Sequence, residues 1–223
     1  MKILFVVAHP DDEVLGAGAT IPRLVSEGHS VAVATMVSQA AARANLSPTL
    51  QSDQARAHAI LGVHRAYAGD FPNIRMNTVP HLELVRFVES AIEDWGAEAI
   101  YTHHPADTNN DHVMTSYAVQ AAARLFQRRE NVPALRQLAY MEVLSSTEWS
   151  LDSSSSRFIP NLFVEIGKEG LEIKLRAAEA YAGVMRPYPH PRSPETITGL
   201  AALRGSQAGC MYAEAFEQVF CRL

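Results

Sequence analysis

Two short segments bring together histidine and aspartate, the residue types that hold divalent metals and move protons. The first, AHPDDE at positions 8–13, directly follows the apolar run at 3–7. The second, THHPADTNNDH, spans 102–112. A short apolar run rich in β-branched residues predicts a buried strand, and packing gives such a strand no reason to end in three carboxylates. Their mutual repulsion is relieved when a cation binds among them.

The second segment also follows an apolar run, at 99–102, and precedes a helical pattern. Ligands of open α/β sheets bind beyond the carboxyl ends of the strands, so both segments are expected to face one crevice. Together they offer the nitrogen and oxygen donors of a catalytic zinc site, in which three protein ligands leave one position open for water. This pattern favours metal-dependent chemistry.

Hydrophobic periodicity and turn residues predict the elements that position these segments. Strands are expected at 2–8, 31–37, 99–102, 137–143 and 161–166, and helices at 13–27, 52–61, 80–95, 111–129, 168–185 and 194–208. Residues 64–79 are expected to be irregular, since they contain turn signals at Gly69, Pro72 and Asn73.

The alternation of strands and helices predicts an α/β fold, a Rossmann-like and mostly parallel sheet with helices on both faces. Residues 1–223 are expected to form a single domain. Gly16 and Gly18 do not make a dinucleotide fingerprint, because the third glycine is replaced by Ile21 and no acidic residue ends the second strand. We expect these two glycines to permit close packing of the first helix on the sheet.

Composition narrows the functional classes. The 223 residues are 48% hydrophobic and 19% charged, with a net charge of -5 and a pI of about 6.0, whereas a nucleic-acid surface is usually basic. No apolar run approaches the roughly 20 residues that span a bilayer. No signal peptide is recognised at the start of the chain, and Cys210 and Cys221 are expected to be reduced thiols. We therefore expect a cytoplasmic protein.

The AHPDDE motif after the first strand, combined with the pair Asp111–His112 at the start of a helix, resembles the LmbE/PIG-L family of zinc-dependent de-N-acetylases. Segments 145–149, 158–161, 189–193 and 204–207 also resemble stretches of bacterial members. The resemblance covers almost the whole chain. It implies a hydrolase that acts on a small N-acetylated amino-sugar substrate, and it favours a homo-oligomer.

Carried over residue by residue, the resemblance implies that His9, Asp12 and His112 are the zinc ligands. It implies that Asp11 is the general base that takes a proton from the attacking water. Because Asp11 and Asp12 are neighbours, their side chains diverge, so that one can bind metal while the other faces substrate. Iron or cobalt could also occupy such a site.

One position departs from the family pattern. Many members carry a histidine where this chain has Asn109, which can donate a hydrogen bond to an oxyanion but cannot act as an acid. Protonation of the leaving amine must then come from elsewhere, and the candidates are Asp11 after it has taken its proton, or His190. The resemblance places Asp111 beside the site, where it would orient a neighbour.

Three residues are candidates for substrate binding. Arg192 could bind a phosphate or a hydroxyl-rich group. His104 could touch substrate or metal, although a histidine at a strand end is often structural. Arg43 lies on or near a loop that faces the strand ends, and a surface role is its alternative.

These observations predict an enzyme that removes an N-acetyl group from an N-acetylglucosamine-type sugar or its conjugate. A deacylase for a non-sugar amide, such as a natural-product or thiol-conjugate precursor, is the nearest alternative. A member that binds metal without catalysis is another, motivated by Asn109. Against the last stands Asp11, because a structural zinc site is normally closed by four protein ligands and needs no spare base.

Overall fold

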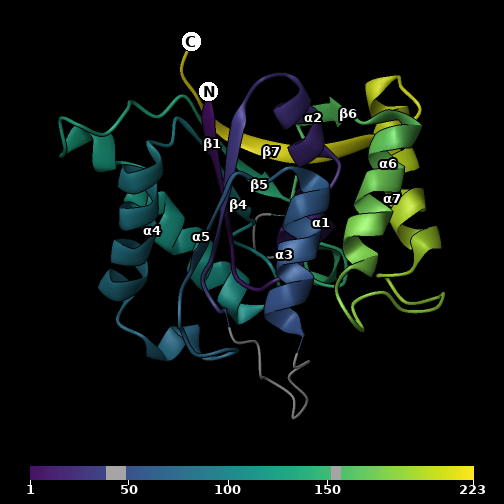
Figure 1. Ribbon diagram of the computed structural model, residues 1–223, viewed down its shortest axis with the longest axis horizontal. Coiled ribbons are helices and arrows are strands. Elements are labelled where there is room, and N and C mark those ends of the chain that lie inside the picture. Colours follow the sequence, from purple (N-terminus) through teal and green to yellow (C-terminus); the bar gives the residue numbers. More distant parts are fainter. Residues whose placement is uncertain (39–48, 152–156) are drawn as a thin grey trace.

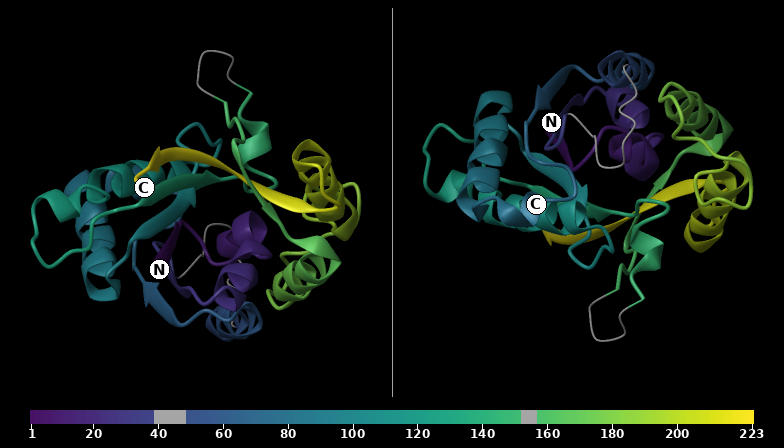
Figure 2. Two further views of the ribbon diagram at one scale, coloured as in Figure 1. Left: turned by 90° about the horizontal axis from the view of Figure 1, so that it is seen from above. Right: turned by 90° about the horizontal axis from the view of Figure 1, so that it is seen from below.

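The computed structural model describes residues 1–38, 49–151 and 157–223. One seven-stranded sheet lies at its centre with helices on both sides (Figures 1 and 2). In chain order its strands are β1 (Lys2–Val7), β2 (Ser30–Thr35), β3 (Arg65–Ala68), β4 (Ala99–His103), β5 (Gln137–Met141), β6 (Leu162–Glu165) and β7 (Ala213–Cys221). Their order across the sheet is β3-β2-β1-β4-β5-β7-β6.

The strands β3, β2, β1, β4 and β5 are parallel, and β7 runs antiparallel to both of its neighbours, β5 and β6. Phe5 of β1 lies opposite Val33 of β2 and Tyr101 of β4. Because β1 and β4 are adjacent and parallel, their carboxyl ends lie side by side. The sheet is therefore mostly parallel and Rossmann-like, as the sequence predicts.

Helices cover both faces of this sheet (Figure 1). The α-helices are α1 (Asp12–Ala17), α2 (Thr20–Ser26), α3 (Leu50–Leu61), α4 (His81–Trp95), α5 (Asn110–Ala122), α6 (Gly167–Glu179) and α7 (Pro194–Ala208). Short 3-10 turns are η1 (Met76–Thr78), η2 (Leu125–Gln127) and η3 (Thr147–Trp149). No helix among the described residues is long and apolar enough to cross a membrane.

The interior strand β1 shows how alternation builds two cores. Leu4 and Val6 pack toward α4 and α5, while Ile3, Phe5 and Val7 pack toward α1, α3 and α6. All five side chains are at most 1% exposed. Full burial of side chains of this size contributes about 1.5–3 kcal/mol each, so β1 is fixed from both faces and its end is a rigid platform.

Three expectations about the elements were wrong. The segment at 13–27 is two helices, because the carboxylate of Glu214 accepts the N–H groups of Ala19 and Thr20 and starts α2 anew. Helix α5 ends at Ala122 rather than 129, and α6 ends at Glu179 rather than 185.

Two strands were also missed. β3 lies inside the segment expected to be irregular, and β7 lies in the C-terminal part for which no strand was expected. The first half of β7 reads AEAF, so the small residues Ala213 and Ala215 and the buried charge of Glu214 hide the usual pattern of a strand. Gly16 does pack closely, since a Cβ there would lie 3.1 Å from the Cβ of Met141.

Candidate metal centre and active site

The candidate site lies at the carboxyl ends of β1 and β4. The turn after β1 carries His9, Asp11 and Asp12 and leads into α1, while the segment after β4 leads into α5 and carries His112 in its first turn. Asn109 caps α5, and its side-chain oxygen accepts the N–H of Asp111 at 2.9 Å. The two loops are thus joined to adjacent strands, which brings their polar side chains together.

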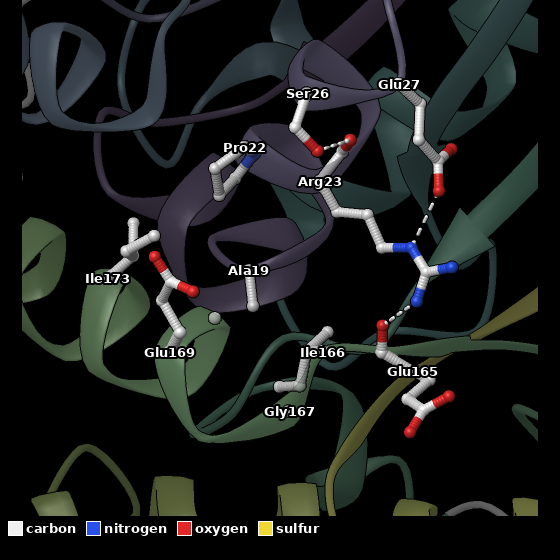
Figure 3. Close-up of a pocket in the computed structure, with 11 residues that line it drawn as sticks. Ala19, Pro22, Arg23, Ser26, Glu27, Glu165, Ile166, Gly167, Glu169 and Ile173 are labelled. Atoms are coloured by element: carbon white, nitrogen blue, oxygen red, sulfur yellow. Dashed lines mark hydrogen bonds and ion pairs between the residues drawn. The ribbon is translucent and has the colours of Figure 1, made fainter.

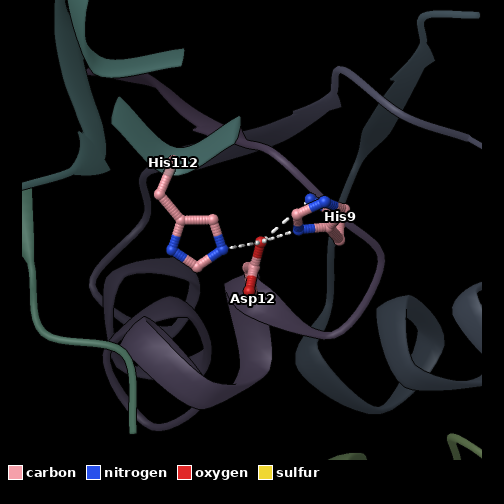
Figure 4. Close-up of side chains that lie close together, drawn as sticks. All are labelled: His9, Asp12 and His112. Carbon is pink, nitrogen blue, oxygen red and sulfur yellow. Dashed lines mark hydrogen bonds and ion pairs between the residues drawn. The ribbon is translucent and has the colours of Figure 1, made fainter. Parts of the chain in front are cut away.

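Three of these side chains converge on one point (Figure 4). The Oδ2 atom of Asp12 lies 3.4 Å from Nδ1 of His9 and 3.3 Å from Nε2 of His112. One donor atom from each residue lies within 4.8 Å of the others. Asp12 and His112 are buried, and the His9 side chain is 12% exposed. The cluster is compact and largely shielded from solvent.

Burial and charge oppose each other at these groups. Burial alone would lower the pKa of His9, but hydrogen bonds to Asp111 and Asp12 raise it to about 9. Burial would also lower the pKa of His112, but the charge of Asp12 and a hydrogen bond to Asp107 raise it to about 10. Burial would raise the pKa of Asp12, yet the charges of His112 and His103 hold it well below its ordinary value.

His112 is held on its far side by Asp107. Its Nδ1 lies 3.2 Å from Oδ2 of Asp107 and 3.3 Å from the hydroxyl of Ser146. Asp107 in turn accepts the hydroxyl of Thr147 at 2.8 Å and the N–H of Asn109 at 2.8 Å. A carboxylate on one imidazole nitrogen fixes the tautomer in which the other nitrogen carries a lone pair, so Nε2 of His112 is directed at the cluster.

His9 has a matching partner in Asp111. Its Nε2 lies 3.1 Å from Oδ2 of Asp111, so its Nδ1 faces Asp12. The same carboxylate accepts the N–H groups of Ile74 at 2.5 Å and Met76 at 3.1 Å. Asp111 therefore ties the loop before η1 to the cluster and orients His9.

The donor set fits a catalytic zinc ion. Two imidazole nitrogens and one carboxylate oxygen, each oriented by a further group, are the ligands expected of such a site. His103 also lies near, with Nε2 at 3.3 Å from Oδ2 of Asp12. However, Nε2 of His103 accepts the N–H of Ala8 at 2.8 Å, so that lone pair is already engaged. A second group, His103, Asp107 and His112, also brings donor atoms within 4.8 Å of one another, and Nδ1 of His103 has no hydrogen-bond partner among the described residues. Both oxygens of Asp107 already accept hydrogen bonds from Asn109, Ser146 and Thr147, so His9, Asp12 and His112 are the better candidate ligand set.

Asp11 lies beside this set without belonging to it. Its Oδ2 accepts a hydrogen bond from Nη1 of Arg192 at 2.9 Å, and Nε of Arg192 donates a hydrogen bond to the hydroxyl of Ser145 at 2.8 Å. Burial raises the pKa of Asp11 to about 7, although the Arg192 charge opposes this. A carboxylate with a pKa near neutrality is suited to accept and return a proton.

The structure does not bring every candidate to the cluster. His190 is exposed, and its Nδ1 accepts the N–H of Arg192 at 3.0 Å. His104 is buried but faces the other way, with Nε2 at 3.4 Å from Glu217 and its ring edge-on to Tyr140. Arg43 lies outside the described residues. The roles of these three residues stay predictions.

Two residues beside the cluster escaped the sequence reasoning. Asp107 was not among the candidate site residues, yet it accepts the N–H of Asn109 and contacts His112. Ser146 comes from the loop after β5, far from the motifs in sequence. A pattern search finds neither contact, because both depend on how separate loops fold together. The position of Asp107 five residues before His112 was the one available signal.

A hollow of about 540 Å³ lies elsewhere, between α2 and α6 (Figure 3). The residues that line it include the apolar Pro22 and Ile173 and also Arg23, whose charge is paired with Glu27 at 2.8 Å. It contains none of the metal-binding candidates. Size alone therefore does not mark the site of chemistry in this molecule.

Comparison with known proteins identifies the class. Residues 4–123, more than half of the chain, match the PIG-L family, described as GlcNAc-PI de-N-acetylase. The chain belongs to this deacetylase family. It is 28% identical over 188 residues to the protein named "Uncharacterized deacetylase YaiS" of Escherichia coli (strain K12), which covers 80% of this chain and 89% of that one.

Solved structures share the fold over nearly the full length. The conserved protein TT1542 from Thermus thermophilus superposes with a TM-score of 0.80 and 23% identity, covering 99% of this chain and 96% of its own. The N,N'-diacetylchitobiose deacetylase from Pyrococcus horikoshii superposes with a TM-score of 0.77 and 18% identity, covering 98% of this chain and 83% of its own. The 4-carboxy-2-hydroxymuconate hydratase GalB from Pseudomonas putida KT2440 superposes with a TM-score of 0.72 and 20% identity, covering 100% of this chain and 98% of its own. At these identities the likeness establishes the fold and leaves the reaction to be argued from the site.

Proposed function

We propose that this protein is a zinc-dependent hydrolase that removes the N-acetyl group of an N-acetylglucosamine-type sugar or its conjugate. The observation that carries the proposal is the cluster of His9, Asp12 and His112, with the unligated carboxylate of Asp11 beside it. A cluster with three protein ligands and a spare base favours a catalytic metal over a structural one. The substrate class is supported by the description of the family and by the name of the Pyrococcus relative.

His9, Asp12 and His112 would hold the metal. Zinc, when bound, supplies Lewis-acid polarisation of the amide carbonyl and lowers the pKa of water to about 7. Iron and cobalt suit the same donors. Asp107 and Asp111 keep the two imidazoles in the orientation that this requires.

Asp11 performs the proton transfers in this proposal. Its carboxylate takes one proton from water as the water oxygen bonds to the amide carbon, and it returns that proton to the nitrogen as the C–N bond breaks. The products are acetate and a free amine. Arg192 orients Asp11 through the hydrogen bond from Nη1 to Oδ2. His190, the other candidate, is exposed and its Nδ1 accepts the N–H of Arg192, which leaves Asp11 as the better-placed proton donor.

Acetate release from N-acetylglucosamine derivatives, measured with zinc and with a chelator, tests this function. We expect turnover that the chelator abolishes and that added zinc restores. Asp11→Ala is expected to keep the metal and to lose at least about 10²-fold in kcat, the usual contribution of a general base. Metal binding with no hydrolysis of any N-acetylated sugar would contradict the proposal. Hydrolysis of non-sugar amides alone would replace its substrate class.

A further inference from the structure

The mechanism does not explain the buried carboxylate of Glu13. Glu13 follows the ligand Asp12 in the chain and is 0% exposed, yet it is not part of the metal-binding group. Burying a carboxylate is costly unless hydrogen bonds compensate for its lost hydration. The partners that compensate Glu13 therefore indicate what the group does.

Both oxygens of Glu13 have a partner. Oε2 accepts the backbone N–H of Asp11 at 3.2 Å. Oε1 accepts the hydroxyl of Tyr181, which lies just beyond α6 and is 2% exposed. Nε2 of His58, from α3, lies 3.4 Å from the same oxygen but lacks the geometry of a hydrogen bond. Glu13 thus connects the backbone of Asp11 to the Tyr181 side chain from the segment after α6, with His58 of α3 close by.

The backbone of Asp11 needs such support. Its φ is 105° and its ψ is -26°, a left-handed conformation that residues other than glycine adopt at a cost. Strain of this kind persists only where surrounding contacts determine it. The conformation directs the Asp11 side chain toward Arg192, beside the metal ligands. If the backbone relaxed, the carboxylate would move.

We propose that Glu13 and Tyr181 are positioning residues that hold Asp11 in its left-handed backbone conformation and thereby place its carboxylate for proton transfer. The chain of contacts runs from the Tyr181 hydroxyl to Oε1 of Glu13 and from Oε2 of Glu13 to the N–H of Asp11. The catalytic consequence rests on the function of Asp11 proposed above. The structural consequence, a constrained Asp11 amide, does not.

Amide hydrogen exchange at Asp11, followed by NMR in the metal-free protein, tests the structural part. We expect the amide to be protected in the wild type and to exchange on the order of 10-fold faster in Tyr181→Phe and in Glu13→Gln. Tyr101→Phe is the matched control, because Tyr101 is equally enclosed in the same core but its hydroxyl bonds Gln137. Unprotected exchange in the wild type, or equal rates in Tyr181→Phe and the control, overturns the proposal.

A double-mutant cycle tests the catalytic part. Tyr181→Phe is expected to lower kcat by about tenfold, as a displaced catalytic group does, with KM and metal content close to those of the wild type. In an Asp11→Asn background the same change is expected to cost nothing further, because the group it positions is gone. An equal loss in both backgrounds assigns Tyr181 to general stability and contradicts the proposal. Full activity of Asp11→Asn itself would refute the function of Asp11, while the exchange measurement would still decide the positioning role.

Discussion

Replacing Asp107 by asparagine tests whether this carboxylate orients His112 for metal binding. The change keeps the shape of the side chain and an oxygen for the N–H of Asn109, but removes the charge that faces Nδ1 of His112 at 3.2 Å. Burial alone would raise the pKa of Asp107, yet its hydrogen bond to His112 and the charge of that ring hold the value at about 2. The interaction is therefore made by a full negative charge across the working pH range.

The expected loss follows from that geometry. Removing a carboxylate that supports a metal-bound histidine typically costs 10- to 100-fold, or about 1.4–2.7 kcal/mol, in metal affinity. We predict a loss in the upper half of this range, because Asp107 is buried and no solvent can replace it. The zinc affinity is measured by competition with a chelating dye.

Glu217→Gln provides the control for this measurement. Glu217 also lies near a histidine, His104, at 3.4 Å, but it is outside the ligand cluster. We expect its zinc affinity to equal that of the wild type. Unchanged zinc affinity in Asp107→Asn, or an equal loss in the control, would show that Asp107 does not orient His112 for metal binding.

Three further predictions concern pH and stability. In the metal-free protein the pKa values of His9 and His112 are raised to about 9 and 10, so zinc must displace protons at neutral pH. The apparent affinity for zinc should therefore rise from pH 7 toward pH 9. Calorimetry in buffers of different ionisation enthalpy should detect the released protons. Because these pKa values are raised by folding, the two imidazoles stabilise the metal-free fold fully below about pH 6.5. This contribution to the free energy of unfolding is lost as pH rises through 9 and 10. A zinc affinity or an unfolding free energy that does not change with pH would contradict the corresponding prediction. Lys174→Met should lower the free energy of unfolding, measured in urea, by about 3–5 kcal/mol, because it leaves the buried Glu214 without its ion-pair partner at 2.6 Å. A loss below about 1 kcal/mol is the size expected of an exposed ion pair and would show that Lys174 contributes little.

The fold and the central cluster were predictable because they depend on local patterns and one general rule. The apolar runs of β1 and β4 are easily recognised, and parallel strands bring their carboxyl ends to one edge of the sheet. His9, Asp12 and His112 are attached to those ends within a few residues, so their convergence follows from topology.

The rest depends on tertiary contacts that no local pattern encodes. Arg192 contacts Asp11 because the loop before α7 lies against the turn that follows β1, and the sequence gives no sign of this contact. Its binding of substrate stays a prediction. His190, two residues earlier, is exposed in the same loop. The strand β7 was missed because its charged residue Glu214 is paired within the core with Lys174 from α6, a partner distant in sequence.

The most direct test of the account is a crystal of the zinc-loaded protein measured at the zinc absorption edge. We expect one anomalous peak among Nδ1 of His9, a carboxylate oxygen of Asp12 and Nε2 of His112, at about 2.0–2.2 Å from each, with Asp11 outside the coordination sphere. A peak at another group of residues, or none on the chain, would contradict the proposed metal centre and the hydrolase function built on it.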